Sequence, residues 1–278
     1  MRQIREQVYS HLSLRQPNGE RTYVKDVRMD IGLIINNYPE LVKAVASISY
    51  NNPRYNLYFR GQPREYLRRL KKGHVCTCYP SIFRYGVASS SAKNPRRRWF
   101  RILNESCDEL MENWRFGGLN RLQKYDELKW TLIQHYQVFR TPLLDLTQSV
   151  RVAASFALLR NSNDYGYVYV FGFPNINGSI SYFVEEELVL VKLQSAAPPQ
   201  ALRTHFQEGY MVGHFPHDQE RNVNKDVSRR MIAKFRVRKG KRFWSKTFPE
   251  IPQLALFPPN DKVEAFVNDL KKADQADL

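Results

Sequence analysis

The chain has 278 residues and a formal net charge of +16, with 42% hydrophobic and 13% aromatic residues. This apolar and aromatic content excludes a disordered chain and can fill the core of one large domain or two small ones. The positive excess indicates a polyanionic partner, because lysine and arginine side chains that neutralise phosphates release counterions; surface charge without a partner is the alternative.

The first elements predicted along the chain are a helix and a strand. Residues 31–49 carry apolar side chains at helical spacing, which predicts an amphipathic helix. Residues 55–60 are typical of a short buried strand. Because side chains alternate along a strand, we expect Leu57 and Phe59 on one face and Tyr58 on the other.

The later elements change from helices to strands. Apolar spacing of three and four residues predicts helices over 100–114 and 126–139. From Gly166 onward, β-branched and aromatic runs predict strands. These strands are expected over residues 167–173, 180–184, 188–193, 206–215 and 231–237. An amphipathic helix over residues 262–272 ends the series.

Helices followed by strands predict an α+β fold, with N-terminal helices and a mostly antiparallel sheet. No linker rich in proline, glycine or serine divides the chain, so we expect a single domain. Its expected parts are an N-terminal helical segment over residues 1–50, the main domain over 51–262, and a C-terminal helix and tail over 263–278.

The three cysteines, Cys76, Cys78 and Cys107, argue against a disulfide framework and fit a reducing cytoplasm. Cys76 and Cys78 have His74 nearby, which is short of the ligand set of a zinc site, so we expect no metal. No apolar run approaches the ~20 residues that cross a bilayer, and no secretory leader opens the chain. These features predict a cytoplasmic protein without a membrane partner.

Arg60 stands where the first predicted strand meets a glycine. A guanidinium group there can hold a pyrophosphate through two parallel hydrogen bonds. Gly61 would let the ligand approach the backbone closely. The alternative is an arginine at a strand end that pairs with an acid.

Two hydroxyl residues, Thr147 and Ser149, precede a helix of small residues over 149–159. One of them is expected to cap that helix. Helix N-termini also bind anions, so the same residues could meet a ligand, and capping alone is the alternative. Asp145 is expected to be partly buried and structural, because a buried carboxylate needs partners.

Gln207 and Glu208 precede the strand predicted toward residue 215. A carboxylate there could stabilise a developing oxocarbenium ion or remove a proton from a nucleophile. An exposed glutamate at a strand edge is the alternative. Residues 185–187 form a rival cluster of three glutamates, which is more typical of a solvated turn.

Basic residues cluster over 225–246, with aromatic residues between them, and again near Trp99. Cations for phosphates and aromatic rings for stacking are typical of single-strand binding. The predicted nucleic-acid contacts are Arg97, Arg98, Arg229, Arg230, Arg236, Arg238, Lys241 and Arg242. The alternative is that Trp99, Phe235 and Trp244 belong to the core.

Several motifs together resemble those of the FRG-domain family, which is named for its Phe-Arg-Gly motif. They are residues 58–62, 79–84, 134–136, 141–147, 153–157, Arg203 with Gln207 and Gly209, and 256–258. Gln137 stands where the family usually has glycine, and Leu146 where it has tryptophan. The order of these motifs is similar to that of ADP-ribosyltransferases, which implies an ADP-ribosyltransferase-like split sheet.

The resemblance also implies roles for individual residues. Arg60, with Gly61 and Gln62, would hold the phosphates of NAD, and Thr147 and Ser149 would lie by the nicotinamide ribose. His135 and Tyr136 belong to the same implied NAD site. Gln207 or Glu208 would occupy the position of the catalytic acid, with Arg60 as a further catalytic residue.

The expected function is transfer of ADP-ribose from NAD to a nucleic acid, with single-stranded RNA favoured as acceptor. Such proteins occur among bacterial toxins and antiviral defence systems, so a neutralising antitoxin protein is an expected partner. A non-catalytic nucleic-acid-binding module and an ADP-ribosyltransferase for protein side chains are the alternatives.

Overall fold

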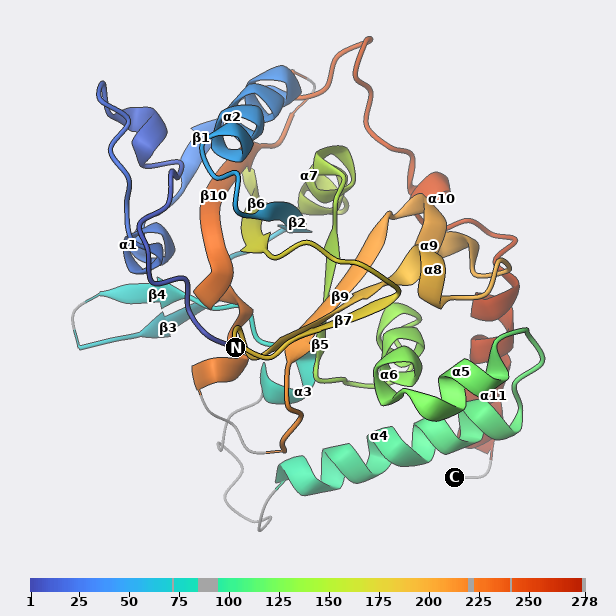
Figure 1. Cartoon of the computed structure of the whole chain (residues 1–278). Helices are drawn as coiled ribbons and strands as arrows, with labels where there is room; N and C mark the ends of the chain where they lie inside the picture. The colour runs from blue at the N-terminus through green and yellow to red at the C-terminus, as the bar shows by residue number, and fades with distance from the viewer. Residues whose placement is uncertain (72, 85–94, 220–222, 241, 277–278) are drawn as a thin grey trace. The chain divides into compact units, whose positions relative to one another are not determined.

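The computed structural model describes the whole chain except residues 72, 85–94, 220–222, 241 and 277–278 (Figure 1). The predicted contact Lys241 lies outside the described residues. Contacts divide the chain into two compact units, each made of three stretches. Unit 1 contains Met1–Cys78, Leu146–Asn175 and Asp226–Leu256, and unit 2 contains Tyr79–Asp145, Ile176–Lys225 and Phe257–Leu278.

The strands of unit 1 follow the hydrogen-bonded order β1-β10-β6-β2-β5. Their bounds are β1 (Leu33–Ile35), β10 (Met231–Arg238), β6 (Tyr165–Phe173), β2 (Asn56–Gln62) and β5 (Leu143–Thr147). β1 runs parallel to β10, whereas β10, β6, β2 and β5 pair antiparallel in turn. A separate hairpin joins β3 (Leu67–Arg69) to β4 (His74–Cys76).

The division between the units falls within β5, whose residues 143–145 belong to unit 2. The strands of unit 2 follow the order β5-β9-β8-β7, and the β9–β8 and β8–β7 pairs are antiparallel. Their bounds are β9 (Gly209–His214), β8 (Leu188–Lys192) and β7 (Ile180–Phe183). The α+β class and the mostly antiparallel sheet are therefore confirmed, and the parallel β1–β10 pair makes the sheet mixed.

The helices agree with most of the predicted positions. Those of unit 1 are α1 (Val24–Met29), α2 (Tyr38–Tyr50), α7 (Val150–Leu158) and α10 (Gln253–Leu256). Those of unit 2 are α3 (Ser81–Arg84), α4 (Pro95–Glu112), α5 (Leu119–Lys124), α6 (Asp126–His135), α8 (Leu193–Ala196), α9 (Leu202–Phe206) and α11 (Lys262–Ala276). Short 3-10 turns lie at Ser13–Arg15, Val223–Lys225 and Val227–Arg230.

The helix predicted over residues 31–49 is wrong in its first part. Residues 33–35 form β1, and α2 begins at Tyr38 after the cap residue Asn37, whose side chain accepts a hydrogen bond from the Glu40 amide. The apolar stripe of α2 then packs into the core of unit 1, with Leu41 and Ile48 fully buried.

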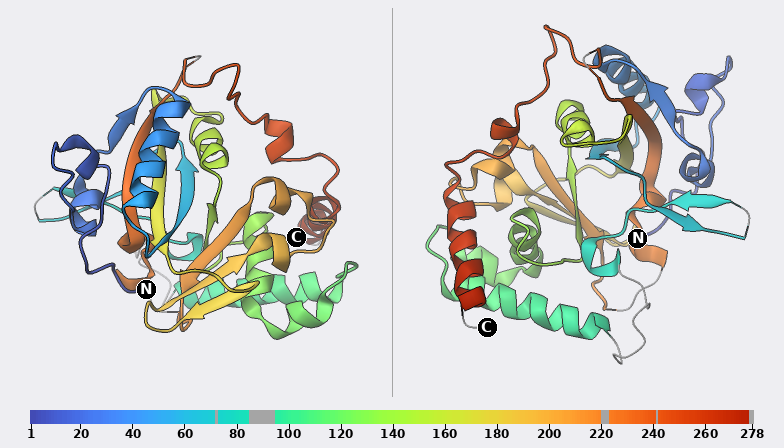
Figure 2. Two further views of the ribbon diagram at one scale, coloured as in Figure 1. Left: turned by 45° about the horizontal axis from the view of Figure 1, so that its top comes forward. Right: turned by 180° about the vertical axis from the view of Figure 1, so that it is seen from behind.

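Helix α7 packs on the same face of the unit 1 sheet as α2 (Figure 2). Two glycines allow this close approach. A Cβ atom at Gly61 would lie 1.7 Å from the carbonyl oxygen of Ala153, and one at Gly166 would lie 2.2 Å from that of Ala157. The geometry therefore gives Gly61 a packing role, because its side-chain position is filled by the backbone of α7.

Candidate functional site

The side chains of β2 alternate between the two faces of the sheet in unit 1. Phe59 packs into the apolar core with α2 and α7. Tyr58 faces the other way, where its ring centroid lies 5.6 Å from that of Phe173. This alternation was predicted, and it places Arg60 and Gln62 on the Tyr58 face.

Arg60 is half-buried on that face and lies opposite Tyr169 of β6. Its Nε lies 3.4 Å from Oε1 of Gln62, and the Gln62 amide donates to the hydroxyl of Tyr169 at 3.1 Å. On the far side of Tyr169, the pairing brings Lys234 into the same row, where it forms a buried ion pair with Glu65. Arg60 is thus a partly exposed guanidinium in a row of otherwise buried polar groups.

Thr147 and Ser149 stabilise the start of α7. The hydroxyl of Thr147 accepts a hydrogen bond from the Ser149 amide at 3.0 Å, and the hydroxyl of Ser149 accepts one from the Val152 amide at 3.4 Å. Thr147 pairs with Phe59, so the two share the face that α7 covers. The structure brings these two hydroxyls together and directs Arg60 to the opposite face of the sheet.

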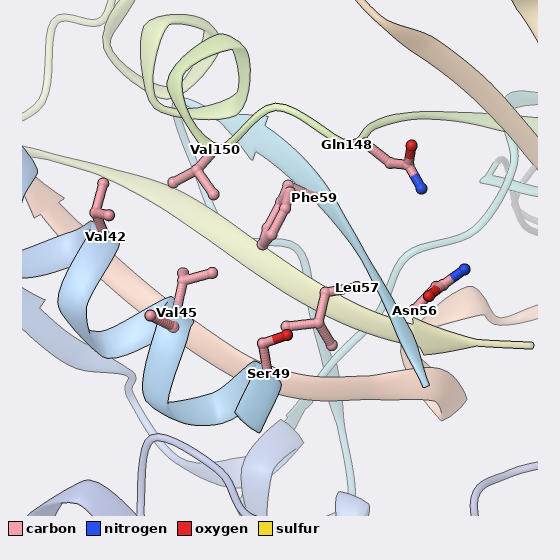
Figure 3. A pocket seen from close by; sticks show the side chains of 9 residues that line it. Val42, Val45, Ser49, Asn56, Leu57, Phe59, Gln148 and Val150 are labelled. Carbon is pink, nitrogen blue, oxygen red and sulfur yellow. The ribbon is translucent and has the colours of Figure 1, made fainter. Parts of the chain in front are cut away.

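An open hollow of about 450 Å³ lies between α2, β2 and the start of α7 (Figure 3). Its lining residues are Val42, Val45, Ala46, Ser49, Asn56, Leu57, Phe59, Gln148 and Val150. The side chains of Asn56 and Gln148 point away from the apolar side chains of Leu57, Phe59 and Val150 (Figure 3). Asn56 pairs with Phe173, so its side chain lies on the Tyr58 face of the sheet. The side chains that face the hollow are therefore mainly apolar, which suits the face of a flat ring.

The sequence interpretation missed Asn56 and Gln148. Gln148 lies between Thr147 and Ser149, so its position next to the predicted site residues could have indicated it. No local pattern predicted the hollow itself, because it depends on how α2 packs against β2.

His135 and Tyr136 lie in the interior of unit 2. Nδ1 of His135 lies 3.9 Å from Oδ1 of Asp145, and its Nε2 has no hydrogen-bond partner among the residues that the structure describes. Burial lowers the pKa of His135, and the Asp145 carboxylate opposes that shift. Tyr136 donates to Oδ2 of Asp261 at 2.9 Å, and burial, together with the Asp261 charge, raises the pKa of Tyr136.

Other residues of the family-like motifs join these two in a polar network within unit 2. The Gln134 side chain donates to Asp145 at 2.9 Å and accepts from the hydroxyls of Ser81 at 3.1 Å and Thr141 at 2.8 Å. Arg203 belongs to the Asp261 part, since its amide donates to that carboxylate at 2.8 Å. The geometry therefore places these motif residues in hydrogen-bonded contacts within unit 2, and Asp145 is half-buried among them.

Gln207 and Glu208 have different surroundings, although they are neighbours. Gln207 is buried at the end of α9, whereas Glu208 is exposed directly before β9. Glu208 has a φ of 46°, a left-handed conformation that favours glycine. Gln137 also has a positive φ, of 56°. Such strain often occurs at functional sites, and Glu208 combines it with an exposed carboxylate.

The predicted nucleic-acid contacts divide by exposure. Arg97 and Arg98 are exposed on α4 of unit 2, and Arg238 and Arg242 are exposed in unit 1. Arg230, in contrast, is buried, and its Nε donates to the carbonyl oxygen of Gly172 at 3.0 Å. It therefore has no surface to offer a phosphate.

Two other predicted contacts are half-buried and also make contacts in unit 1. Nε of Arg229 donates to the carbonyl oxygen of Met1 at 3.1 Å. The guanidinium of Arg236 lies 4.4 Å from the ring centroid of Tyr165. Both residues therefore contribute to the fold of unit 1 in addition to its charge.

The cysteines are buried free thiols. Within the described ranges, no three His, Cys, Asp or Glu side chains gather in a way that could hold a metal ion. No helix in the described part of the chain combines the length and apolar character needed to cross a membrane.

Residues 55–165 match the FRG domain, which supports the resemblance to that family over less than half of the chain. The matched stretch includes β2, α6, β5 and α7, and so contains Phe59, Gln148 and Val150 of the hollow. Comparison with curated proteins found no match, and comparison with solved structures found none either.

Proposed function

We propose that the protein is an ADP-ribosyltransferase that transfers ADP-ribose from NAD to a nucleic acid, with single-stranded RNA as the favoured acceptor. In this proposal it acts as a toxin in antiviral defence, and a protein antitoxin neutralises it. The observation that supports the NAD part is the hollow of about 450 Å³, because the β2 and α7 sides of that hollow lie in the stretch that matches the FRG domain.

The hollow fits one of the two flat heteroaromatic rings of NAD. Apolar side chains such as Val45 and Phe59 would contact the faces of the ring. Val150 is the first residue of α7, so a phosphate attached to this ring would lie near the positive end of the helix. Arg60 projects from the other face of β2, so its proposed role at the NAD phosphates needs a test of its own.

Glu208 is the proposed catalytic carboxylate, and its exposure favours it over the buried Gln207. In the reaction, the bond between ribose C1′ and the nicotinamide nitrogen breaks, and nicotinamide leaves with the electron pair. The carboxylate would stabilise the oxocarbenium-like ribose that develops. A nucleophile of the acceptor then forms the new bond to C1′ and loses its proton.

Incubation of the full chain with NAD labelled in its adenylate part, together with single-stranded RNA, single-stranded DNA or protein, tests this function. We expect label on RNA, and loss of that label in Glu208→Gln but not in the control Glu185→Gln, which changes another exposed glutamate of unit 2. Label on protein alone would identify a protein-directed transferase. No transfer, together with salt-dependent RNA binding, would identify a non-catalytic binding module.

The ring pocket and Arg60 can be tested apart from transfer. Ala46 lines the hollow and is exposed, so Ala46→Trp should fill the hollow and abolish NAD binding in calorimetry, whereas Ala46→Ser should not. Unchanged NAD binding by Ala46→Trp would contradict the assignment of the hollow. Arg60→Lys should weaken NAD binding if the guanidinium holds the phosphates, since lysine cannot bind them through two parallel hydrogen bonds.

A further inference from the structure

A second open hollow, of about 630 Å³, lies in unit 1 where the chain leaves β10. Its lining includes Leu158, Lys239, Trp244, Lys246, Pro249 and Glu250. The segment that forms it runs past α2 and α7 (Figure 2), and the Arg151 guanidinium of α7 donates to the carbonyl oxygen of Pro249 at 2.9 Å. The hollow therefore has a fixed wall on the α7 side.

The indole of Trp244 is held in place by its aromatic neighbours. Phe243 is buried beneath it with ring centroids 4.9 Å apart, and the Tyr38 ring lies 5.2 Å away at a tilt of 31°. The Tyr38 amide also donates to the carbonyl oxygen of Phe243 at 2.8 Å, which ties the segment to α2. Because Trp244 stays half-exposed and lines the hollow, it offers a rigid aromatic surface.

The charge around this surface is mainly positive. Lys239 donates to the carbonyl oxygen of Asn161, which fixes its ammonium group and leaves it two further N–H donors. Lys246 is exposed, and Arg151 lies at the rim through its contact with Pro249. Glu250 is the acid in the lining, so cations outnumber acids among these residues.

We propose that this hollow binds single-stranded nucleic acid, with an unpaired base stacked on Trp244 and the adjoining phosphates held by Lys239 and Lys246. A fixed aromatic ring flanked by cations is suited to a strand whose bases are free to stack, whereas the bases of a duplex are already stacked on each other. The inference rests on the proposed function in one respect, since it names the surface that would hold the acceptor strand.

Binding of a labelled 12-nucleotide RNA by the full chain, measured by fluorescence anisotropy without NAD, tests this inference. Trp244→Ala should weaken binding about tenfold, which is the typical effect of removing one stacked base contact. Lys246→Gln and Lys239→Gln should each weaken binding and lower the dependence on salt by about one phosphate contact. The duplex form of the same sequence should bind more weakly than the single strand.

Control variants keep the inference falsifiable. Tyr50→Ala removes an aromatic side chain that is 84% exposed, and Lys43→Gln removes an exposed lysine of α2, so neither should change binding. Trp244→Phe retains a ring and should keep most of the affinity, whereas equal losses in the Phe and Ala variants would overturn the stacking contact. If Trp244→Ala does not fold, the two lysine variants decide the question.

The result is separable from the test of the proposed function because NAD is absent. If RNA binding depends on Trp244 and the separate assay with labelled NAD shows no transfer, the surface is supported and the transferase is refuted. Affinity that is unchanged in all three variants would overturn this surface, whatever the outcome with NAD. Equal loss of heparin and RNA binding in Trp244→Ala would also overturn it, because heparin has no bases to stack.

Discussion

Among the basic residues around β10, a buried group and an exposed group have opposite surroundings. Arg230, just before the strand, and Lys234, within it, are buried. Arg238, Arg242 and Lys246, at the end of the strand and beyond it, are exposed. The buried cations contact a backbone carbonyl and a glutamate, and the exposed ones border the hollow at Trp244 or lie near it in sequence. Basic residues that are neighbours in sequence thus have two roles: the buried ones make contacts inside the protein, and the exposed ones contribute positive charge to its surface.

The largest effect that separates the two groups should come from Lys234. Lys234→Ala leaves the Glu65 carboxylate without its buried partner, and we expect a loss of about 3–5 kcal/mol in the free energy of unfolding. The exposed counterpart, Lys246→Ala, should change this free energy by less than about 0.5 kcal/mol. Urea denaturation of both variants measures the contrast, and similar small values for both would remove it.

A smaller effect is expected at Arg230. Arg230→Gln shortens the side chain that donates to the Gly172 carbonyl, and we expect a loss of about 2 kcal/mol because a buried acceptor loses a charged donor. The folded fraction should bind RNA with unchanged affinity. Arg238→Gln should show the reverse pattern, with unchanged stability and weaker, less salt-dependent RNA binding. Weaker RNA binding by folded Arg230→Gln would contradict the division into two groups.

The same contrast between buried and exposed groups applies to histidines. Burial lowers the pKa values of His11 and His135 in the folded protein, so the unfolded chain takes up protons first as the pH falls below ~6.5. Stability should therefore decrease from pH 7 to pH 5, by at most about 1.4 kcal/mol per pH unit for each histidine.

Urea denaturation as a function of pH measures this slope. His135→Gln should flatten it, because the buried imidazole with the lowered pKa is then removed. A slope that His135→Gln leaves unchanged would show that this histidine does not contribute to it.

The smallest expected effect concerns an exposed acid that strains the backbone. Glu208→Gly should raise the free energy of unfolding by up to about 1 kcal/mol, because glycine adopts a positive φ without steric strain. Glu187 has a φ of 54° outside the proposed site, so Glu187→Gly should give a similar gain. A gain in stability at position 208 with loss of ADP-ribose transfer would separate the conformational role of Glu208 from its chemical role.

Local patterns predicted much of the fold. The alternation of Leu57, Tyr58 and Phe59 is confirmed, since a strand buried on both faces still alternates its side chains. β1 was missed because Ile34 and Ile35 fit the apolar stripe of the helix that follows. Asn37 as a cap and Pro39 in the first turn carried the signal that the helix begins later.

The candidate site was less accessible to sequence reasoning. Strand alternation alone predicts that Arg60 and Phe59 lie on opposite faces of the sheet. That Thr147 lies on the Phe59 face depends on the pairing of β5 with β2. That register links residues far apart in the chain, and no local pattern determines it. The same reason explains Arg230 and Lys234, whose burial depends on Gly172 and Glu65 elsewhere in the sequence.

The contact of α7 with Gly61 and Gly166 limits how the hollow between α2 and β2, the proposed NAD site, could change its size. Helix and strands meet there at backbone distance, so Phe59 on the strand and Val150 on the helix keep a constant separation. Helix α2 is the remaining wall, and its Val42 is 41% exposed beside the hollow. A bulkier ligand could therefore be admitted by displacement of α2, and that helix is the place to look for adaptation to different substrates.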